Sequence, residues 1–456
     1  MSDLAGKRIT VMGLGRFGGG IGVTRWLCSQ GADVLVTDKD PALELADSVA
    51  QIQTLVDTGQ VTLRLGEHNV SDFTTCDLVV ANAAVPKPWE NRFLRAAEAA
   101  GIPITTEITL TIEQLRARGV SRTVGVTGSV GKSTTTAMIH HALQTAIGTS
   151  GPRVVMGGNI GGSLLGALDR IDASTIVVLE LSSAMLYWLD RTLTPKWSPH
   201  VAVITNISAN HLDWHGELPH YAASKKHLIE LQTAGDFALL GESVWEWRSA
   251  SAAASARADA IPFPRALKLP GDHNQVNAAM ALAACAAIAP ELPRESIEAA
   301  IASFPGLSHR LQLVAEERSP GGEPRRFYND SKSTTPESAL TAVRALAAMP
   351  GMSLGKLHLI AGGYDKGSDL SPIAKLGGEL GGLYTIGVTG PTIARGASGR
   401  ASECGTLLNA VPQALKNMKP GDALLLSPGC ASWDQYTNFE ARGDEFVRLI
   451  KDSVTP

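Results

Sequence analysis

One glycine-rich run in the sequence has the residue types of a phosphate-binding loop. The run Gly125–Thr134 (GVTGSVGKST) follows a short apolar segment and precedes a helical pattern. Backbone N–H groups of such a loop bind phosphate oxygens, Lys132 can neutralise the β/γ charge, and the Ser133 hydroxyl can ligate Mg²⁺. The spacing departs from GxxxxGK[ST], because Val126 stands six positions before Lys132. We predict a nucleoside-triphosphate site rather than a structural glycine turn, formed by Gly128, Ser129, Gly131, Lys132, Ser133 and Thr134.

A second glycine-rich run, Gly13–Gly18 (GLGRFG), stands directly after the first apolar segment. Its glycines permit a tight turn and the close approach of a phosphate to a helix N-terminus. Asp38 ends the next predicted strand, where a ribose-binding acid would lie. By itself this pattern fits an NAD-dependent dehydrogenase, and it also fits a glycine turn that only packs a helix on a strand. The dehydrogenase hypothesis leaves the phosphate-binding loop unexplained.

Polar side chains also occur where two further strands are predicted to end. Glu180 lies in the run VLELSS, and His211 and Asp213 lie in the run ITNISANHLDWH. Strand ends beside a phosphate-binding loop are suitable positions for metal ligands. The alternative is that each side chain is solvated or caps a helix. The presence of both beside the loop favours the metal site.

The segments that must position these residues are short apolar runs separated by helical patterns. Such runs are typical of buried parallel strands. They are Arg8–Gly13, Val34–Thr37, Leu78–Ala81, Thr123–Thr127, Ile176–Glu180, Ala202–Thr205, Leu357–Ala361, Tyr384–Val388 and Ala423–Ser427. Their alternation with helical segments predicts an α/β protein. The run Ser249–Ala260 is low in complexity, and we expect an exposed loop or a frayed helix without chemistry there.

A length of 456 residues suits about three domains. The pattern breaks at Arg116–Arg122 and near Phe304–Arg310, which predicts domains at residues 1–121, 122–307 and 308–456. A hydrophobic fraction of 44% and a net charge of −4 indicate a globular protein without the basic surface of a dedicated nucleic-acid binder.

The cysteines, the N-terminal segment and the apolar stretches indicate in which cellular compartment the protein is found. The five cysteines are widely spaced and form no CxxC pair, so a zinc ribbon or a disulfide framework is not expected. The N-terminus runs straight into a strand-like segment, which leaves no room for a secretory signal. The most apolar helical stretch, Ala278–Ala289, is too short to span a bilayer. We expect a cytoplasmic protein, with no membrane or nucleic-acid partner.

Three polar clusters downstream could each cap a helix or stabilise a turn. They are His273–Asn277 (HNQVN), His309–Arg310 and Asn329–Lys332 (NDSK). Together with other motifs, these clusters resemble the Mur ligase family of ATP-dependent amide-forming enzymes over nearly the whole chain. The motifs that carry the resemblance are TGSVGKST, GGNIG (Gly157–Gly161), LELSS (Leu179–Ser183), NHLD (Asn210–Asp213), YAASK (Tyr221–Lys225), HNQVN, GLSHR, NDSKSTTP, AGGYDKG (Ala361–Gly367) and SPGCASWDQYTNFEARGDEF (Ser427–Phe446). The last two resemble the D-glutamate-adding members of the family most.

The resemblance implies three α/β domains and one reaction. The N-terminal domain would be Rossmann-like and bind UDP, the central one a P-loop mononucleotide-binding domain, and the C-terminal one Rossmann-like and bind an amino acid. ATP, with Mg²⁺ as two ions, would drive the addition of D-glutamate to UDP-N-acetylmuramoyl-L-alanine through an acyl phosphate. We expect a monomer. Another Mur or folylpolyglutamate synthetase-type ligase, and a nucleotide-gated binding protein without catalysis, stay as alternatives.

The resemblance also implies roles for matching residues. Lys225 matches the lysine that the family carbamylates, a change that converts a cation into an anionic metal ligand; otherwise it would be an ordinary exposed helix lysine beside Lys226. The implied metal ligands are Ser133, Glu180, His211 and Lys225, and the implied catalytic residues are Lys132, His211, Lys225 and Lys332. Further ATP contacts are implied at Asn274, Asn277, Arg310 and Asp330. Substrate contacts are implied at Gly15, Arg16, Asp38 and Asn159 for the UDP-sugar, and at Lys366, Ser432 and Phe439 for D-glutamate.

Several departures from the family pattern concern contacts rather than the core chemistry. They are Phe17 in the first glycine run, Asn82–Val85 where SPG is usual, Val130 in the P-loop, Ala184–Met185 where Phe-Gln is usual, and Asn210 where an acid usually precedes His211. We expect them to alter uridine and sugar contacts more than ATP binding, and we expect Asn210 to weaken metal binding.

Overall fold

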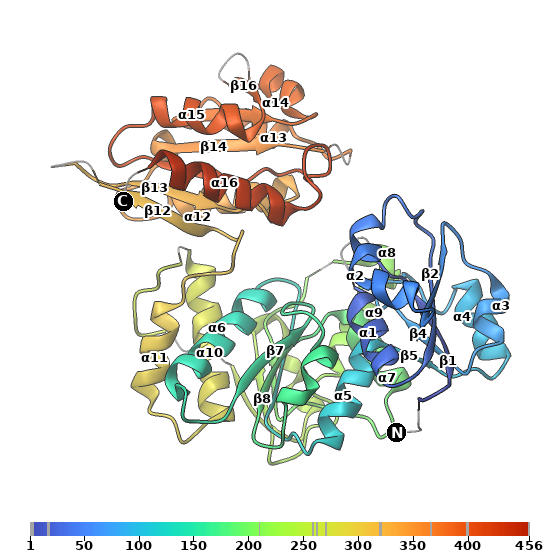
Figure 1. The fold of residues 1–456 in the computed structure, drawn as a ribbon. Coiled ribbons are helices and arrows are strands. Elements are labelled where there is room, and N and C mark those ends of the chain that lie inside the picture. The colour runs from blue at the N-terminus through green and yellow to red at the C-terminus, as the bar shows by residue number, and fades with distance from the viewer. Residues whose placement is uncertain are drawn as a thin grey trace. The chain divides into compact units, whose positions relative to one another are not determined.

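The chain divides into two compact units, which are visible in the computed structural model of Figure 1. The first unit comprises Met1–Pro264 and Val276–Ile301, and the second comprises Arg265–Gln275 and Ala302–Pro456. The structure describes residues 4–15, 19–208, 210–257, 260, 263–269, 271–318, 322–364, 367–397 and 401–454. Over these residues, no helix is both long and apolar enough to cross a membrane.

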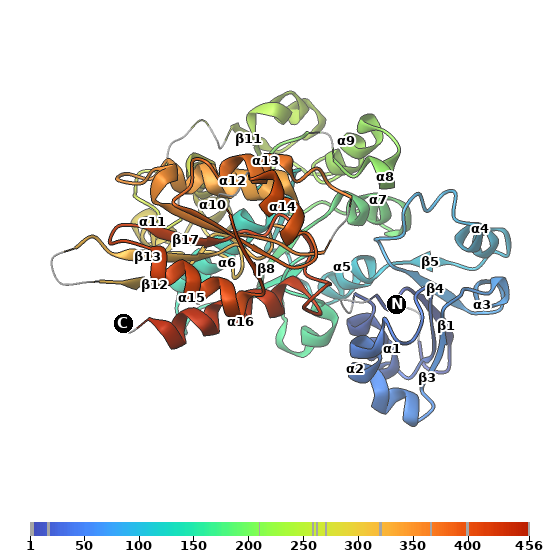
Figure 2. The same cartoon turned by 90° about the horizontal axis from the view of Figure 1, so that it is seen from above.

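The first unit begins with a five-stranded parallel sheet in the order β3-β2-β1-β4-β5. Its strands are β1 (Arg8–Met12), β2 (Asp33–Asp38), β3 (Val61–Leu65), β4 (Leu78–Ala81) and β5 (Ile104–Thr105). Its helices are α1 (Ile21–Ser29), α2 (Ala46–Asp57), α3 (Val70–Thr74), α4 (Arg92–Ala99) and α5 (Glu107–Ala117). Figure 2 shows α1 and α2 on one side of this sheet and α3 and α4 on the other. Because helices cover both faces, the central strand is apolar on both sides and almost entirely buried.

A six-stranded parallel sheet follows in the same unit, in the order β11-β10-β9-β6-β8-β7. Its strands are β6 (Thr123–Thr127), β7 (Val154–Gly158), β8 (Ile176–Glu180), β9 (Val201–Ile204), β10 (Phe237–Leu240) and β11 (Ala254–Arg257). Its helical segments are α6 (Lys132–Ile147), η1 (Leu164–Arg170), α7 (Ser183–Thr192), α8 (Leu212–His215), α9 (Leu218–Lys226) and η2 (Glu242–Ala250), and the chain continues through α10 (Asp272–Ile288) and α11 (Arg294–Ser303). The three central strands β9, β6 and β8 are completely buried.

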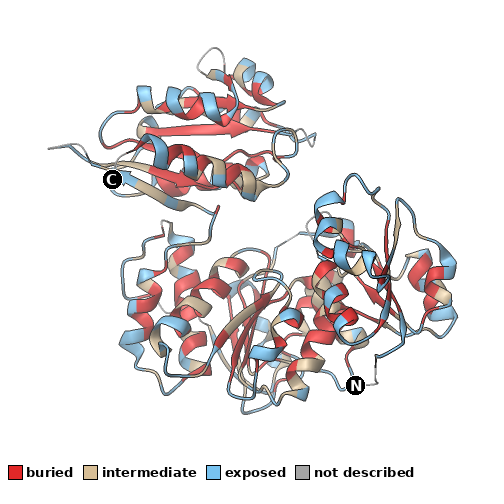
Figure 3. Cartoon of the chain, in the orientation of Figure 1, coloured by how far each residue is buried: buried red, intermediate tan, exposed pale blue. Residues whose placement is uncertain are grey.

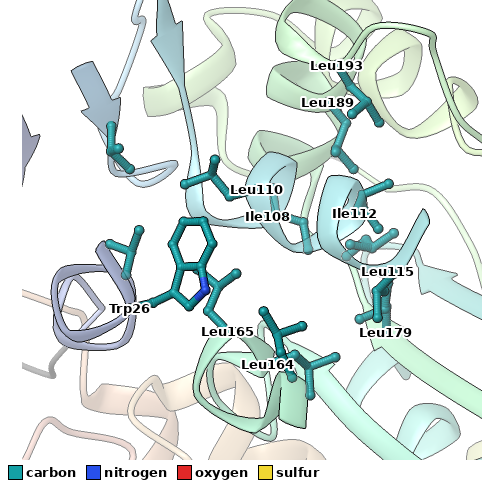
Figure 4. Close-up of a cluster of buried hydrophobic side chains, with 14 of the residues drawn as sticks. Trp26, Ile108, Leu110, Ile112, Leu115, Leu164, Leu165, Leu179, Leu189 and Leu193 are labelled. Carbon is teal, nitrogen blue, oxygen red and sulfur yellow. The ribbon is translucent and has the colours of Figure 1, made fainter. Parts of the chain in front are cut away.

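The two sheets of the first unit share one hydrophobic core. Trp26 of α1 and Ile108 of α5 belong to the same cluster of buried side chains as Leu164 and Leu165 of η1 and Leu179 of β8. Figure 4 shows several of these side chains gathered between the elements, and Figure 3 shows the buried residues concentrated on the strands and on the inner faces of the helices. Burial of this much apolar surface stabilises the unit as one body.

The second unit is built on a six-stranded sheet in the order β12-β13-β17-β14-β15-β16, in which only the pair β12·β13 is antiparallel. Its strands are β12 (Gln312–Glu317), β13 (Arg325–Asn329), β14 (Leu357–Gly362), β15 (Gly382–Ile386), β16 (Ser402–Gly405) and β17 (Ala423–Leu426). Its helices are α12 (Pro336–Ala347), η4 (Leu354–Lys356), α13 (Ser371–Leu376), α14 (Gly390–Gly396), α15 (Leu407–Asn417) and α16 (Phe439–Ser453). Helices α12, α13 and α14 cover one face, and α15 and α16 cover the other (Figure 2).

Every apolar run predicted as a strand overlaps a strand of the structure, and the α/β class is confirmed. The strand predicted at Tyr384–Val388 begins and ends two residues earlier, as β15. The interpretation of Ser249–Ala260 as a loop or frayed helix is wrong in part, because Ala254–Arg257 pairs with β10 at the edge of the second sheet. The side chains of this Ala-Ser-Ala-Arg strand alternate between exposed and half-buried, so the strand lacks an apolar run and depends on backbone pairing.

Candidate active site

The P-loop lies between β6 and α6 and depends on two glycines. Gly128 has φ +143°, and a Cβ atom added there would lie 2.0 Å from Oγ1 of Thr205. Gly131 has φ +86° and precedes the first residue of α6. Thr205 Oγ1 also donates to the Val130 carbonyl at 2.6 Å. The loop is therefore held against the end of β9 in a conformation that side chains would disturb.

Lys132 is the first residue of α6, and its Nζ donates to the Ser129 carbonyl at 3.0 Å. The Ser129 hydroxyl lies 3.0 Å from the Tyr221 hydroxyl and accepts from the Ser208 N–H at 2.9 Å. Ser133 is buried in the first turn of α6, with Thr134 beside it. The predicted loop residues thus come together at one helix N-terminus, where backbone N–H groups and the helix dipole favour anions.

Glu180 is fully buried at the end of β8, beside β6. Its Oε1 accepts from Asn159 Nδ2 at 2.6 Å, whereas its Oε2 has no hydrogen-bond partner among the residues that the structure describes. A buried carboxylate oxygen without a donor is costly, and it fits a site where a cation completes the coordination. The hydroxyl of Ser133 and the carboxylate of Glu180 are oxygen donors of the kind that Mg²⁺ prefers. Within the described residues there is no group of three or more His, Cys, Asp or Glu side chains placed to hold a metal.

Lys225, near the end of α9, is a buried lysine in the same site. It is 1% exposed, and its Nζ donates to Thr127 Oγ1 at 3.1 Å and to the Gly128 carbonyl at 2.9 Å. Burial, with a smaller effect of Lys132, lowers the pKa of Lys225 to about 6. The interpretation of Lys225 as an ordinary exposed helix lysine is therefore wrong.

His211 precedes α8 with φ +51° and lies on the rim of the same site. Partial burial and then Lys132 hold its pKa below the usual value. Four residues later, the buried His215 has its Nε2 2.9 Å from Ser183 Oγ and its Nδ1 2.9 Å from His220 Nδ1. Burial lowers the pKa of His215 to about 4, so this side chain is a neutral hydrogen-bonding link. The sequence analysis missed His215, whose only signal was its position inside the helix that follows His211.

A cavity of about 740 Å³ brings together four of the predicted first-unit site residues, which are Lys132, Asn159, His211 and Lys225. Side chains and backbone from both sheets line it, and among these are Gly13, Lys132, Asn159, Met185, His211 and Lys225. The departures Asn82 and Ala184 also lie on its wall. The cavity therefore lies between Gly13, after β1, and the P-loop lysine Lys132, and its volume is in the range of small-molecule sites.

Two other predicted nucleotide contacts, Gly15 and Asp38, bind each other and do not line the cavity. Asp38 Oδ2 accepts from the Gly15 N–H at 2.9 Å, and its Oδ1 accepts from the Asp40 N–H at 3.0 Å. Neither Gly15 nor Asp38 is among the described residues that line the cavity. Arg16 and Phe17 lie outside the described residues.

The two asparagines of α10 divide between the units. Asn277 Oδ1 accepts from Thr135 Oγ1 at 3.3 Å and lies close to Gly131, next to the P-loop. Asn274 belongs to the second unit and is buried there.

In the second unit, predicted site residues gather where β13 and β17 end. Asp330 Oδ2 accepts from the Ser427 hydroxyl at 2.8 Å, and its Oδ1 accepts from the Leu311 N–H at 3.1 Å. Burial raises the pKa of Asp330 to about 7 despite these hydrogen bonds. Lys332 Nζ lies 5.2 Å from the centre of the Phe439 ring, a cation–π contact. Ser432 is buried, Arg310 is exposed, and Lys366 lies outside the described residues.

A buried arginine that the sequence analysis missed holds these loops together. Arg442 of α16 is 1% exposed and donates to Ser331 Oγ at 3.0 Å and to the Ser331 carbonyl at 2.8 Å. It also donates to the carbonyls of Cys430 and Ala431, both at 3.1 Å. One guanidinium therefore connects the loop after β13 to the loop after β17.

Three family models match this chain in succession. The Mur ligase MurD-like N-terminal domain matches residues 7–106, the Mur ligase middle domain matches residues 126–263, and the Mur ligase glutamate ligase domain matches residues 309–430. With a P-loop beside a two-sheet cavity and a third sheet in a separate unit, the chain belongs to the Mur ligase family.

Curated relatives match nearly end to end. A UDP-N-acetylmuramoylalanine–D-glutamate ligase from Symbiobacterium thermophilum is 33% identical, with 98% of each chain covered. The enzyme of the same name from Anaeromyxobacter dehalogenans is 34% identical, with 99% of each chain covered. A solved UDP-N-acetylmuramoyl-L-alanyl-D-glutamate–2,6-diaminopimelate ligase shares the fold, with a TM-score of 0.53, 17% identity, and coverage of 82% of this chain and 92% of that one.

Proposed function

We propose that this protein joins D-glutamate to UDP-N-acetylmuramoyl-L-alanine, using ATP, in the synthesis of a peptidoglycan precursor. The observation that supports this most is the near-complete match to relatives named for that reaction. The site adds chemical support, because a P-loop, a buried lysine and a carboxylate with an unpartnered oxygen lie on or beside one cavity. The protein is an ATP-dependent ligase of the Mur family.

The reaction requires activation of a carboxylate. A carboxylate is a poor electrophile, because its charge repels an attacking amine and its leaving group would be oxide. The alanyl carboxylate attacks the γ-phosphorus of ATP, which forms an acyl phosphate and releases ADP. The amine of D-glutamate then attacks the acyl carbon, and the tetrahedral intermediate collapses to the amide and inorganic phosphate, with loss of the amine proton.

Phosphoryl transfer of this kind depends on positioning and charge neutralisation. Lys132 and the backbone N–H groups at the start of α6 bind the phosphates. Ser133, Glu180, His211 and Lys225 are the residues that would hold Mg²⁺, as two ions, and the bound metal would supply charge neutralisation for the transferring phosphate. Asn159 fixes the orientation of Glu180 through its hydrogen bond.

Lys225 has the surroundings required for carbamylation. Only a neutral amine can attack CO₂, and burial favours the neutral amine. Attack forms the N–C bond and releases a proton, and the resulting carbamate anion is attracted to the positive charge of Lys132. In this account, the modified side chain would serve as an anionic metal ligand.

The substrates occupy separate regions of the chain. The UDP-sugar contacts Asn159 and the first glycine run, including Gly15, Arg16 and Asp38, and ATP also contacts Asn274, Asn277, Arg310 and Asp330. D-Glutamate, which carries two carboxylates, is held by Lys366, Ser432 and Phe439. Lys332 stabilises negative charge during phosphoryl transfer. The three domains comprise residues 1–121, 122–307 and 308–456. The protein acts in the cytoplasm as a monomer.

Phosphate release provides the direct test. The purified chain is given ATP, Mg²⁺ and UDP-N-acetylmuramoyl-L-alanine with D-glutamate, L-glutamate, L-lysine or no amino acid, and the product is identified by mass. Release and an amide product only with D-glutamate are expected. A product with another amino acid would indicate a different Mur or folylpolyglutamate synthetase-type ligase. ATP binding without product would indicate a nucleotide-gated binding protein, and NADH-dependent turnover would revive the dehydrogenase hypothesis.

A further inference from the structure

Two aromatic rings are exposed together in the second unit. Tyr364, two residues after β14, is 42% exposed, and Trp433, in the loop after β17, is 47% exposed. Their ring centroids lie 5.5 Å apart at a tilt of 54°. Val388, two residues after β15, is 67% exposed. An exposed apolar group of this kind on a folded surface indicates a ligand or a partner.

The rings stand where ligands bind in sheets of this type. Strands β14 and β17 are neighbours, and the strand order reverses there, because the chain runs outward from β14 to β15 and β16 and then returns to place β17 between β13 and β14. Ligands of α/β folds bind beyond the carboxyl ends of strands at such a reversal. Ser432, the proposed D-glutamate contact, is the residue directly before Trp433.

The backbone under the rings is held in place. The Tyr364 N–H donates to the Ala431 carbonyl at 2.9 Å, and Arg442 donates to the same carbonyl at 3.1 Å. Asp434 accepts from the Val388 N–H at 2.9 Å, which fixes the loop after β15 to the loop after β17. A backbone held in this way places the two aromatic residues in advance, so little loop freedom is lost when a ligand binds.

We propose that Tyr364 and Trp433 form an aromatic wall that packs against the carbon chain of the incoming D-glutamate and so sets the affinity for the amino acid. This inference rests on the proposed function. The carbon chain of glutamate is apolar between its two charged ends, and cations and hydroxyls bind only those ends. The wall supplies the apolar contact through its two rings.

The test compares the KM for D-glutamate in five variants. Trp433→Ala and Tyr364→Ala are expected to raise this KM at least tenfold, while the KM values for ATP and UDP-N-acetylmuramoyl-L-alanine and the melting temperature change little. Trp433→Phe and Tyr364→Phe keep a ring and are expected to stay within about threefold of wild type. Leu408→Ala, which truncates an exposed apolar side chain on α15, is the matched control and should match wild type.

Other outcomes overturn the inference or the proposed function separately. A KM for D-glutamate within twofold of wild type in both alanine variants overturns the wall. The wall is also overturned if these variants change the association state without changing that KM, since the patch would then join copies of the chain. If wild type forms product only with another amino acid, the proposed function is wrong, and the same KM comparison with that amino acid decides the inference. Absence of any amide product contradicts both.

Discussion

The reactivity of individual residues in this protein depends on burial more than on residue type. Lys225 is a lysine next to another lysine in the sequence, yet it is 1% exposed and has a pKa of about 6. Its identity and motif could be predicted from the sequence, but its burial could not, because α9 carries no apolar stripe that would orient it. His215 and Arg442 were missed for a related reason. Each makes hydrogen bonds to residues that are distant in the chain, and no local sequence pattern predicts such contacts.

Replacement of Lys225 tests its modification. Lys225→Ala is expected to lower kcat by at least about 10²-fold, because it removes a preorganised charged group next to the reacting phosphate. A short carboxylic acid such as acetate should restore part of the activity by occupying the space of the carbamate. Steady-state kinetics with and without acetate measure both effects.

Lys226→Ala is the matched control for this variant. Lys226 is the adjacent residue at the end of the same helix, it is only partly buried, and it should be replaceable with little loss of activity. A Lys225→Ala enzyme that stays active and does not respond to acetate would show that the lysine has only a structural role.

At the scale of elements, continuous apolar runs predicted the buried central strands of the sheets. They did not predict the strands at the sheet edges. Strands such as β11 and β12 are short or half-exposed, and their pairing depends on backbone hydrogen bonds that any side chain permits. The P-loop could be predicted because its glycines are required by the backbone. Gly128 in particular faces the hydroxyl of Thr205 at a distance that excludes a side chain.

The glycine requirement of the P-loop can be measured. Gly128→Ala is expected to raise the KM for ATP at least tenfold and to cost about 1–3 kcal/mol of stability, because it combines a steric clash with a positive φ. Gly166→Ala is the control, since Gly166 lies in η1 with open space where a Cβ would be added. An unchanged KM for ATP in Gly128→Ala would contradict the geometry described for this loop.

Asp330, in the loop after β13, should make the free energy of unfolding depend on pH. The folded protein raises the pKa of Asp330 to about 7, whereas an unfolded aspartate titrates near 4. Between about pH 4 and pH 7 the folded state therefore keeps a proton that the unfolded state releases, so the free energy of unfolding falls as pH rises through this window. The loss is a few kcal/mol at most, at about 1.4 kcal/mol for each pKa unit.

Asp330→Asn should flatten this pH dependence while keeping an oxygen that accepts hydrogen bonds. Melting temperatures of the second unit measured from pH 4 to pH 8 compare the variant with wild type. Asp452→Asn, on the exposed end of α16, should leave the slope unchanged. If the melting temperature of Asp330→Asn changes with pH as steeply as that of wild type, groups other than Asp330 cause the pH dependence of stability.

At the scale of the whole molecule, the number of sheets differs from the number of compact units. The sequence patterns predicted three α/β domains, and the three sheets are present, but the first two sheets bury one hydrophobic core in a single unit. The packing of Trp26 with side chains of η1 could not be predicted, because the sequence of α1 does not indicate which element this helix packs against. Both sheets line one cavity, so the shared core keeps the cavity wall near β1 and β4 next to Lys132 of the P-loop.

Trp26→Ala tests whether the first two sheets unfold together. The substitution should cost about 3–5 kcal/mol, as for large-to-small changes in a core. Hydrogen exchange is expected to increase in β6 and β8 as well as in β1, because the cluster is common to both sheets. Increased exchange confined to the first sheet would mean that the two sheets are stabilised independently. Leu449→Ala, in the core of the second unit, should leave exchange in β1 and β6 unchanged.

The central claim is that this protein activates the alanyl carboxylate of a sugar nucleotide as an acyl phosphate for attack by D-glutamate. The most direct measurement uses UDP-N-acetylmuramoyl-L-alanine with ¹⁸O in its carboxylate and follows the mass of the released phosphate. One ¹⁸O atom in the phosphate, with amide product formed only when D-glutamate is present, is the predicted result. Unlabelled phosphate would contradict the account, because it would come from attack of water on ATP.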